Sequence, residues 1–145
     1  MTLQGYHVLG ELCRGASHVV LRGTRVADGA PVLLKGPQRQ PPPPAQVEEL
    51  RREFALLSEL PLPGLPRILD LARLDGSVWL VLEDTGAIPL PALLAAAKLD
   101  VATSIHIALQ LASVIGELHR RDVVHGSVQP EIGRASCRER VYVLV

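Results

Sequence analysis

Runs of apolar and β-branched residues dominate the first part of the chain in a pattern that is typical of β-strands. Such runs occupy residues 6–9, 18–25 and 32–35, and residues 13–17 form a short break between the first two. Asp28-Gly29 is a strong turn signal before the third run. The pattern predicts three antiparallel strands connected as a meander.

A helical period replaces this pattern over residues 46–60. Its apolar positions share one face and are Val47, Leu50, Phe54 and Leu57. Charged residues fill most of the other face, Glu53 lies at the edge between the two, and Pro61 and Pro63 end the helix. The four prolines at residues 41–44 predict a stiff extended linker, with a ligand for an SH3-like module as the alternative.

The rest of the pattern predicts a hairpin and two helices. The hairpin pairs residues 68–72 with residues 78–82, and the helices cover residues 90–98 and 104–118. The polar residues of the longer helix form one narrow stripe, namely His106, Gln110, Ser113 and Glu117. Such a helix should be buried nearly all round, but the remaining residues are too few to cover it, so apolar surface would stay exposed.

This order of elements indicates an α+β chain, and composition narrows the class further. Apolar residues make up 48% of the 145 residues, and 15 basic residues balance 15 acidic ones. The chain is therefore not expected to be disordered, and its charge gives no reason to expect nucleic acid or a membrane surface as a partner. No signal peptide is recognisable, and the apolar stretches are too short or too interrupted to span a bilayer, which favours a cytoplasmic protein. Cys13 and Cys137 are too few for a disulfide framework or a zinc site.

This order of elements resembles the N-terminal lobe of a eukaryotic-type protein kinase. In both, three strands with a lysine at the end of the third precede a helix with a glutamate and then a hairpin. The similarity covers about residues 5–131. It implies a protein-kinase-like fold, with a five-stranded antiparallel N-lobe sheet and its helix over residues 1–84. A hinge and the start of an incomplete helical C-lobe would follow over residues 85–131. The resemblance also implies ATP as the cofactor, and Mg²⁺ only in an intact parent protein, because the metal ligands of the family are absent here.

The first motif is the glycine-rich loop, whose backbone N–H groups approach the ATP phosphates in this family. The segment from Leu12 to Val20 stands at its place, and the resemblance assigns both of these residues to the adenine site. Only Gly15 matches a glycine of the pattern, because Cys13 and His18 replace the other two. A plain hairpin turn is the alternative for this segment.

The second motif is Val-Leu-Leu-Lys at residues 32–35, which matches the Val-Ala-Ile-Lys strand of the family. The resemblance implies that Lys35 holds the α- and β-phosphates and that Glu53 orients it through an ion pair. Leu33 takes the place of the alanine and would crowd the adenine pocket. Lys35 and Lys98 are the only lysines of the chain. The alternatives are a lysine that extends into water and a solvated helix glutamate.

The third motif resembles the fifth strand of the family running into the hinge. Leu82 takes the gatekeeper position, and the main chain of Glu83 and Thr85 would hydrogen-bond adenine. Side-chain identity tests these contacts poorly because they are made by the backbone.

The fourth motif resembles the end of the long C-lobe helix followed by the catalytic loop. His125, Pro130 and Glu131 match the pattern His-Arg-Asp-Leu-Lys-Pro-Glu-Asn. Ser127 stands at the position of the base aspartate and Gln129 at that of the catalytic lysine. A serine hydroxyl cannot act as a carboxylate base near neutral pH, so this loop resembles those of pseudokinases.

The matches leave three functions open. The first is an N-terminal fragment of a Ser/Thr protein kinase whose catalysis is impaired at Ser127 and Gln129. The second is a pseudokinase, a regulatory binding module with or without ATP. The Leu-Pro-Gly-Leu-Pro turn of this chain is similar to that of a bacterial group of signalling proteins. In that group a kinase-like domain stands at the start of a long protein that also contains a sensor histidine kinase. A small-molecule phosphotransferase ranks last because it also needs an aspartate at Ser127. The substrate and any protein partner stay unknown.

Residues 132–145 depart from the family pattern. After Glu131 the chain reads Ile-Gly-Arg-Ala-Ser-Cys-Arg-Glu-Arg-Val, which is one translated frame of a common short-read sequencing adapter. We expect this tail to be non-native and the preceding residues to be an incomplete domain. Such a domain lacks metal ligands and a substrate groove, and should not transfer phosphate.

Resequencing the locus tests the origin of the tail. We expect genomic reads to diverge from the adapter-like sequence near codon 131. A genomic read that continues in frame through codons 132–145 would show instead that the basic tail is native.

Overall fold

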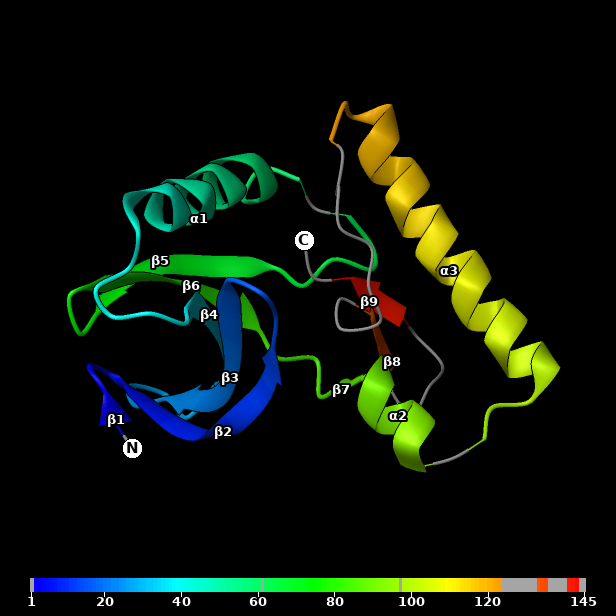
Figure 1. Ribbon diagram of the computed structural model, residues 1–145, viewed down its shortest axis with the longest axis horizontal. Coiled ribbons are helices and arrows are strands. Elements are labelled where there is room, and N and C mark those ends of the chain that lie inside the picture. The colour runs from blue at the N-terminus through cyan, green and yellow to red at the C-terminus, as the bar shows by residue number, and fades with distance from the viewer. Residues whose placement is uncertain (1, 61, 97, 124–132, 136–140, 144–145) are drawn as a thin grey trace. The chain divides into compact units, whose positions relative to one another are not determined.

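The computed structural model of the chain describes residues 2–60, 62–96, 98–123, 133–135 and 141–143 (Figure 1). The chain divides into two compact units. The first comprises Met1–Pro61 and Arg67–Asp84, and the second comprises Leu62–Pro66 and Thr85–Val145.

The first unit contains an antiparallel sheet, and its strands confirm the predicted meander and hairpin. In sheet order the strands are β1 (Thr2–Leu3), β2 (Tyr6–Arg14), β3 (His18–Arg25), β4 (Pro31–Pro37), β6 (Ser77–Glu83) and β5 (Ile68–Leu74). The hairpin therefore enters the sheet through β6, beside β4. The observed strands differ from the prediction in their bounds, since β2 continues to Arg14 and β4, β5 and β6 each extend beyond the predicted residues. Strand β1 is an additional strand that is too short to show a period.

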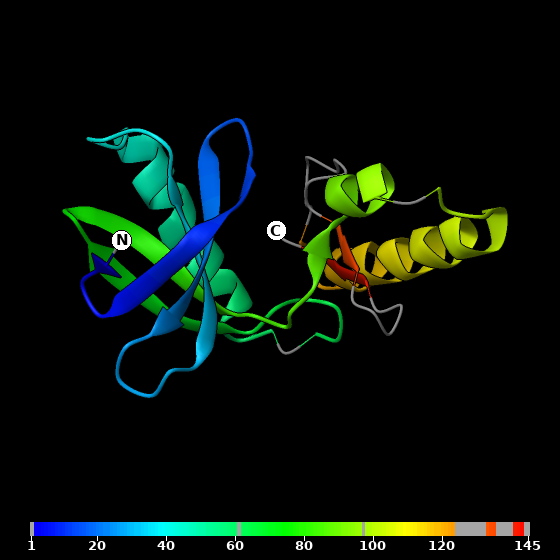
Figure 2. The ribbon, with the colours of Figure 1, turned by 90° about the horizontal axis from the view of Figure 1, so that it is seen from below.

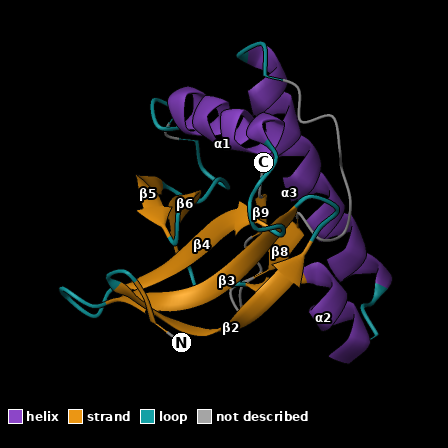
Figure 3. Ribbon diagram, turned by 60° about the vertical axis from the view of Figure 1, so that its left-hand side comes forward, coloured by secondary structure: helices purple, strands orange, loops and turns teal. Residues whose placement is uncertain are grey.

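Helix α1 (Pro44–Leu57) packs against β4, β5 and β6 (Figure 3). It begins at Pro44, inside the run that predicted an extended linker, because a first-turn N–H has no partner within the helix and proline tolerates that position. The predicted apolar face is confirmed. Leu50 is fully buried and Phe54 is half-buried, while Arg51 and Arg52 are exposed.

Strand β4 is buried on both of its faces. Val32 and Leu34 join Trp79 and Val81 of β6 in the core cluster on one face. Because side chains alternate along a strand, Lys35 points to the opposite face. That face is the one covered by α1, since Lys35 hydrogen-bonds a carboxylate of this helix. One strand thus links the hydrophobic core to the polar contacts described below.

The second unit holds two helices and a small antiparallel sheet (Figure 2). Its elements are β7 (Ile88–Pro89), α2 (Leu90–Ala96), α3 (Val101–Arg120), β8 (Gly133–Ala135) and β9 (Val141–Val143). The two last strands belong to the adapter-like tail. Helix α3 starts earlier than predicted because the Asp100 side chain caps it by accepting the Thr103 N–H at 2.6 Å.

The surface of α3 is largely apolar and exposed. Only Val114 and Leu118 are buried in this helix, so the expected exposure of its apolar surface is confirmed. Val101, Ile105 and Leu109 are 76%, 55% and 65% exposed. In the part of the chain that the structure describes, α3 is the one helix long and apolar enough to cross a bilayer. The sequence analysis expected no apolar stretch to be long enough to span a bilayer, and by length and composition α3 differs from that expectation.

Gly36 tests the packing of the core against β4. A Cβ at this position would lie 2.2 Å from the indole of Trp79, so we expect Gly36→Ala to lower the free energy of unfolding by about 2 kcal/mol. Urea unfolding followed by circular dichroism measures the change. Gly10→Ala in β2 is the control, because no heavy atom lies within 4 Å of its Cβ. Equal effects of the two substitutions would show that the Trp79 indole does not pack tightly against Gly36.

Candidate functional site

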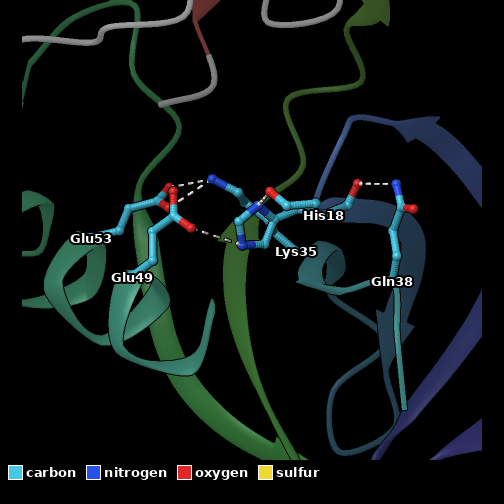
Figure 4. Close-up of polar contacts among 6 residues, drawn as sticks. His18, Lys35, Gln38, Glu49 and Glu53 are labelled. Carbon is cyan, nitrogen blue, oxygen red and sulfur yellow. Dashed lines mark hydrogen bonds and ion pairs between the residues drawn. The ribbon is translucent and has the colours of Figure 1, made fainter. Parts of the chain in front are cut away.

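A buried ion pair joins the sheet to α1 (Figure 4). Lys35 Nζ donates to Glu53 Oε1 at 2.8 Å and to Glu53 Oε2 at 2.7 Å. The two side chains are 11% and 12% exposed. A lysine that extends into water and a solvated glutamate are therefore both wrong interpretations, and the predicted partners are in contact.

Local structure explains why these two side chains meet. Lys35 pairs in register with Val20 of β3 and Leu80 of β6, so strands on both sides hold its backbone in place. Glu53 follows the fully buried Leu50 by three residues, which places the two on neighbouring positions of the helix surface. Burial of Leu50 thus turns Glu53 toward the sheet.

Strand register gathers three of the predicted adenine-site side chains on the same face as Lys35. Val20 is the register partner of Lys35, and Leu33 is the partner of Leu82. Cross-strand partners share a face, and Leu33 shares that face with Lys35 because they are two residues apart. All of these side chains are buried. The structure therefore brings together an apolar floor and an ammonium group; contact with adenine stays a prediction.

The loop between β2 and β3 is a tight hairpin connection. The Gly15 N–H donates to the His18 carbonyl at 2.9 Å, and Gln38 Nε2 donates to the carbonyl oxygens of Gly15 and His18. A Cβ on Gly15 would make only an ordinary contact of 3.7 Å, so the hairpin does not require glycine there. Leu12 lies at a register shift, and Cys13 is the residue paired with Val20. The hairpin alternative describes this geometry, and the phosphate-binding role stays a prediction.

The His18 side chain lies beside the ion pair. It is 13% exposed, its Nε2 lies 3.8 Å from Glu49 Oε2, and its Nδ1 lies 2.8 Å from Ser17 Oγ. Burial lowers the pKa of His18 below its usual range; Lys35 lowers it further, and Glu49 opposes the shift. In the sequence His18 stands at a glycine position of the pattern, and no local pattern signals the direction of its ring.

A second ion pair anchors the end of β6. Arg22 Nε donates to Asp84 Oδ2 at 2.6 Å, and its terminal nitrogen donates to Oδ1 at 3.0 Å. The Asp84 side chain is only 6% exposed. The Glu83 N–H donates to the Arg67 carbonyl at 2.9 Å, so this N–H is not available to a ligand. Thr85 belongs to the second unit.

Two of the predicted catalytic positions, Ser127 and Gln129, lie outside the described residues. Within the described residues, no group of three or more His, Cys, Asp or Glu side chains could hold a metal ion. No protein-family model matches the sequence, and no curated protein is significantly similar to it.

A double-mutant cycle tests the coupling of Lys35 to Glu53. We expect Lys35→Met and Glu53→Gln each to cost about 3 kcal/mol of unfolding free energy, because each removes one charge of a buried pair. The double variant should cost less than the two together, with a coupling of at least about 1 kcal/mol in urea unfolding.

Glu48→Gln is the matched control for this cycle. Glu48 lies on the same helix, is 60% exposed and faces Arg52 at 3.7 Å, so its loss should cost no more than about 0.5 kcal/mol. If the unfolding costs of the Lys35 and Glu53 substitutions simply added, the two side chains would not be coupled, which would contradict the ion pair.

Proposed function

We propose that this chain is the nucleotide-binding lobe of a protein-kinase-like domain, and that it binds ATP without transferring its phosphate. The observation that carries the proposal is the Lys35–Glu53 pair, with contacts of 2.7 and 2.8 Å between the third strand of a meander and the next helix. Protein kinases use a lysine on the third strand and a glutamate on the following helix in this way.

The surroundings of the pair support nucleotide as the ligand. An ammonium group is a compact charge for phosphate oxygens, and Glu53 restricts where the Lys35 ammonium can lie. Val20, Leu33 and Leu82 form a buried apolar surface on the same face of the sheet, which suits a flat base. Phosphate and base would then bind along one face.

The sequence of the catalytic loop argues against phosphoryl transfer. Ser127 and Gln129 replace the base and the lysine that the family uses, and a serine hydroxyl does not accept a proton in the manner of an aspartate. We infer a cytoplasmic regulatory role, as in pseudokinases attached to bacterial signalling enzymes.

A regulatory module that binds a protein partner without nucleotide is the second candidate. It is favoured by Leu33, which is 2% exposed and stands where the family has alanine. A larger buried side chain at this position leaves less room for a base.

Thermal unfolding with ATP separates the two candidates. We expect ATP at about ten times its Kd to raise Tm by about 3 °C or more, both with and without Mg²⁺. Lys35→Met should abolish the shift, whereas Lys98→Met, the control at the other lysine, should keep it. No shift would favour the module without nucleotide. Transfer of phosphate from ATP to a generic protein substrate would contradict the proposed loss of catalysis.

A further inference from the structure

His18 occupies a position where the resemblance expects a glycine, and its ring does not extend into solvent. The side chain is 13% exposed and lies beside the side chains of Lys35 and Glu49 (Figure 4). The Ser17 hydroxyl at 2.8 Å from Nδ1 fixes the ring from its own turn. His18 therefore places an imidazole close to the Lys35 ammonium.

The imidazole has one nitrogen without a hydrogen-bond partner. Nε2 of His18 is buried, and its distance of 3.8 Å from Glu49 Oε2 is too long for a hydrogen bond. Glu49 is 63% exposed, so water screens its charge. Burial without a hydrogen-bond partner is unfavourable for a polar nitrogen, and a ligand oxygen could supply the missing contact.

The charged groups that face His18 come from two other elements. Lys35 approaches from β4 and Glu49 from α1, where Glu53, one turn further along the helix, holds the Lys35 ammonium. Glu53 already accepts from Lys35 with both of its oxygens. Protonation of His18 would place a second positive charge beside Lys35. The negative charge left to compensate it is that of Glu49, which is exposed to water. Two adjacent cations of this kind suit a phosphate, whose several oxygens can accept from both.

We propose that His18, in its protonated form, joins Lys35 in binding a phosphate group of the nucleotide. The inference rests on the proposed function and adds a residue that the glycine-rich pattern does not contain. It also makes the affinity of the site for phosphate depend on pH, because His18 titrates.

The direction of the pH dependence follows from charge. Burial and Lys35 hold the pKa of His18 below its usual value, so the ligand-free ring is neutral near pH 7. An anion beside the ring favours the charged form, so binding takes up a proton and affinity rises as pH falls. Without ligand the effect on folding has the opposite sign. The folded ring binds its proton less tightly than the unfolded chain does, so stability falls as pH drops below about 6.5.

Calorimetric titration of the full chain with ADP and with adenosine, both without Mg²⁺, tests the proposal. We expect ADP to bind about fivefold more tightly at pH 6.0 than at pH 7.5, with proton uptake seen by comparing buffers of different ionisation enthalpy. Adenosine has no phosphate, and its affinity should not change. His18→Asn removes the titrating ring, so the affinity of this variant for ADP should change less with pH. Its profile also shows how much of the change comes from protonation of ADP itself.

Glu49→Gln provides a variant on an exposed helix face that leaves His18 in place. Loss of this carboxylate removes a competitor of the phosphate, and ADP should bind about threefold more tightly at pH 6.0. Glu48→Gln, at the neighbouring position, is the control and should leave the affinity unchanged.

Equal pH profiles for ADP in the native chain and in His18→Asn would overturn the role of His18 and leave nucleotide binding intact. Absence of binding by both ADP and adenosine would overturn the proposed function, and this inference with it.

Discussion

The first unit depends on one electrostatic constraint: a lysine ammonium can lie under a helix only if a carboxylate accompanies it. Lys35 is 9% exposed as a residue, and removing a charge from water without a partner is strongly unfavourable. Glu53 meets this requirement with both oxygens, and it can do so only while α1 lies on the face of β4 that Lys35 occupies. The position of the helix and the burial of the charge therefore require each other. A contact of this kind defines one arrangement of the helix on the sheet, although its net contribution to stability is small.

Strand β4 carries this constraint into the core. Its alternate residues Val32 and Leu34 pack with Trp79, while Leu33 and Lys35 lie on the opposite face, where Lys35 contacts α1. Because the interior is close-packed, a change on one side of such a strand is felt on the other. The geometry of the polar contacts and the packing of the hydrophobic cluster are thus properties of the same seven residues, Pro31–Pro37.

Much of the first unit could be predicted because its signals are local. Alternation and turn residues predicted β3 to the residue, and the helical period predicted the buried face of α1. The pairing of Lys35 with Glu53 followed from a resemblance of spacing. The Arg22–Asp84 pair could not be predicted, because its partners are 62 residues apart and meet only through the register of three strands. The helical pattern of α3 shows which residues are apolar but not what covers them, and its exposure was predicted only because too few residues remain to cover it.

The close approach of Trp79 to Gly36 also gives the protein a built-in optical reporter. Trp79 is the only tryptophan of the chain, and its indole lies against the backbone immediately after Lys35. The indole lies on the opposite face of the sheet from the ammonium, so a ligand at Lys35 would not touch it. Any change in its emission on ligand addition would therefore report movement of β4 itself, and the fluorescence of one residue would distinguish a rigid sheet from one that adjusts.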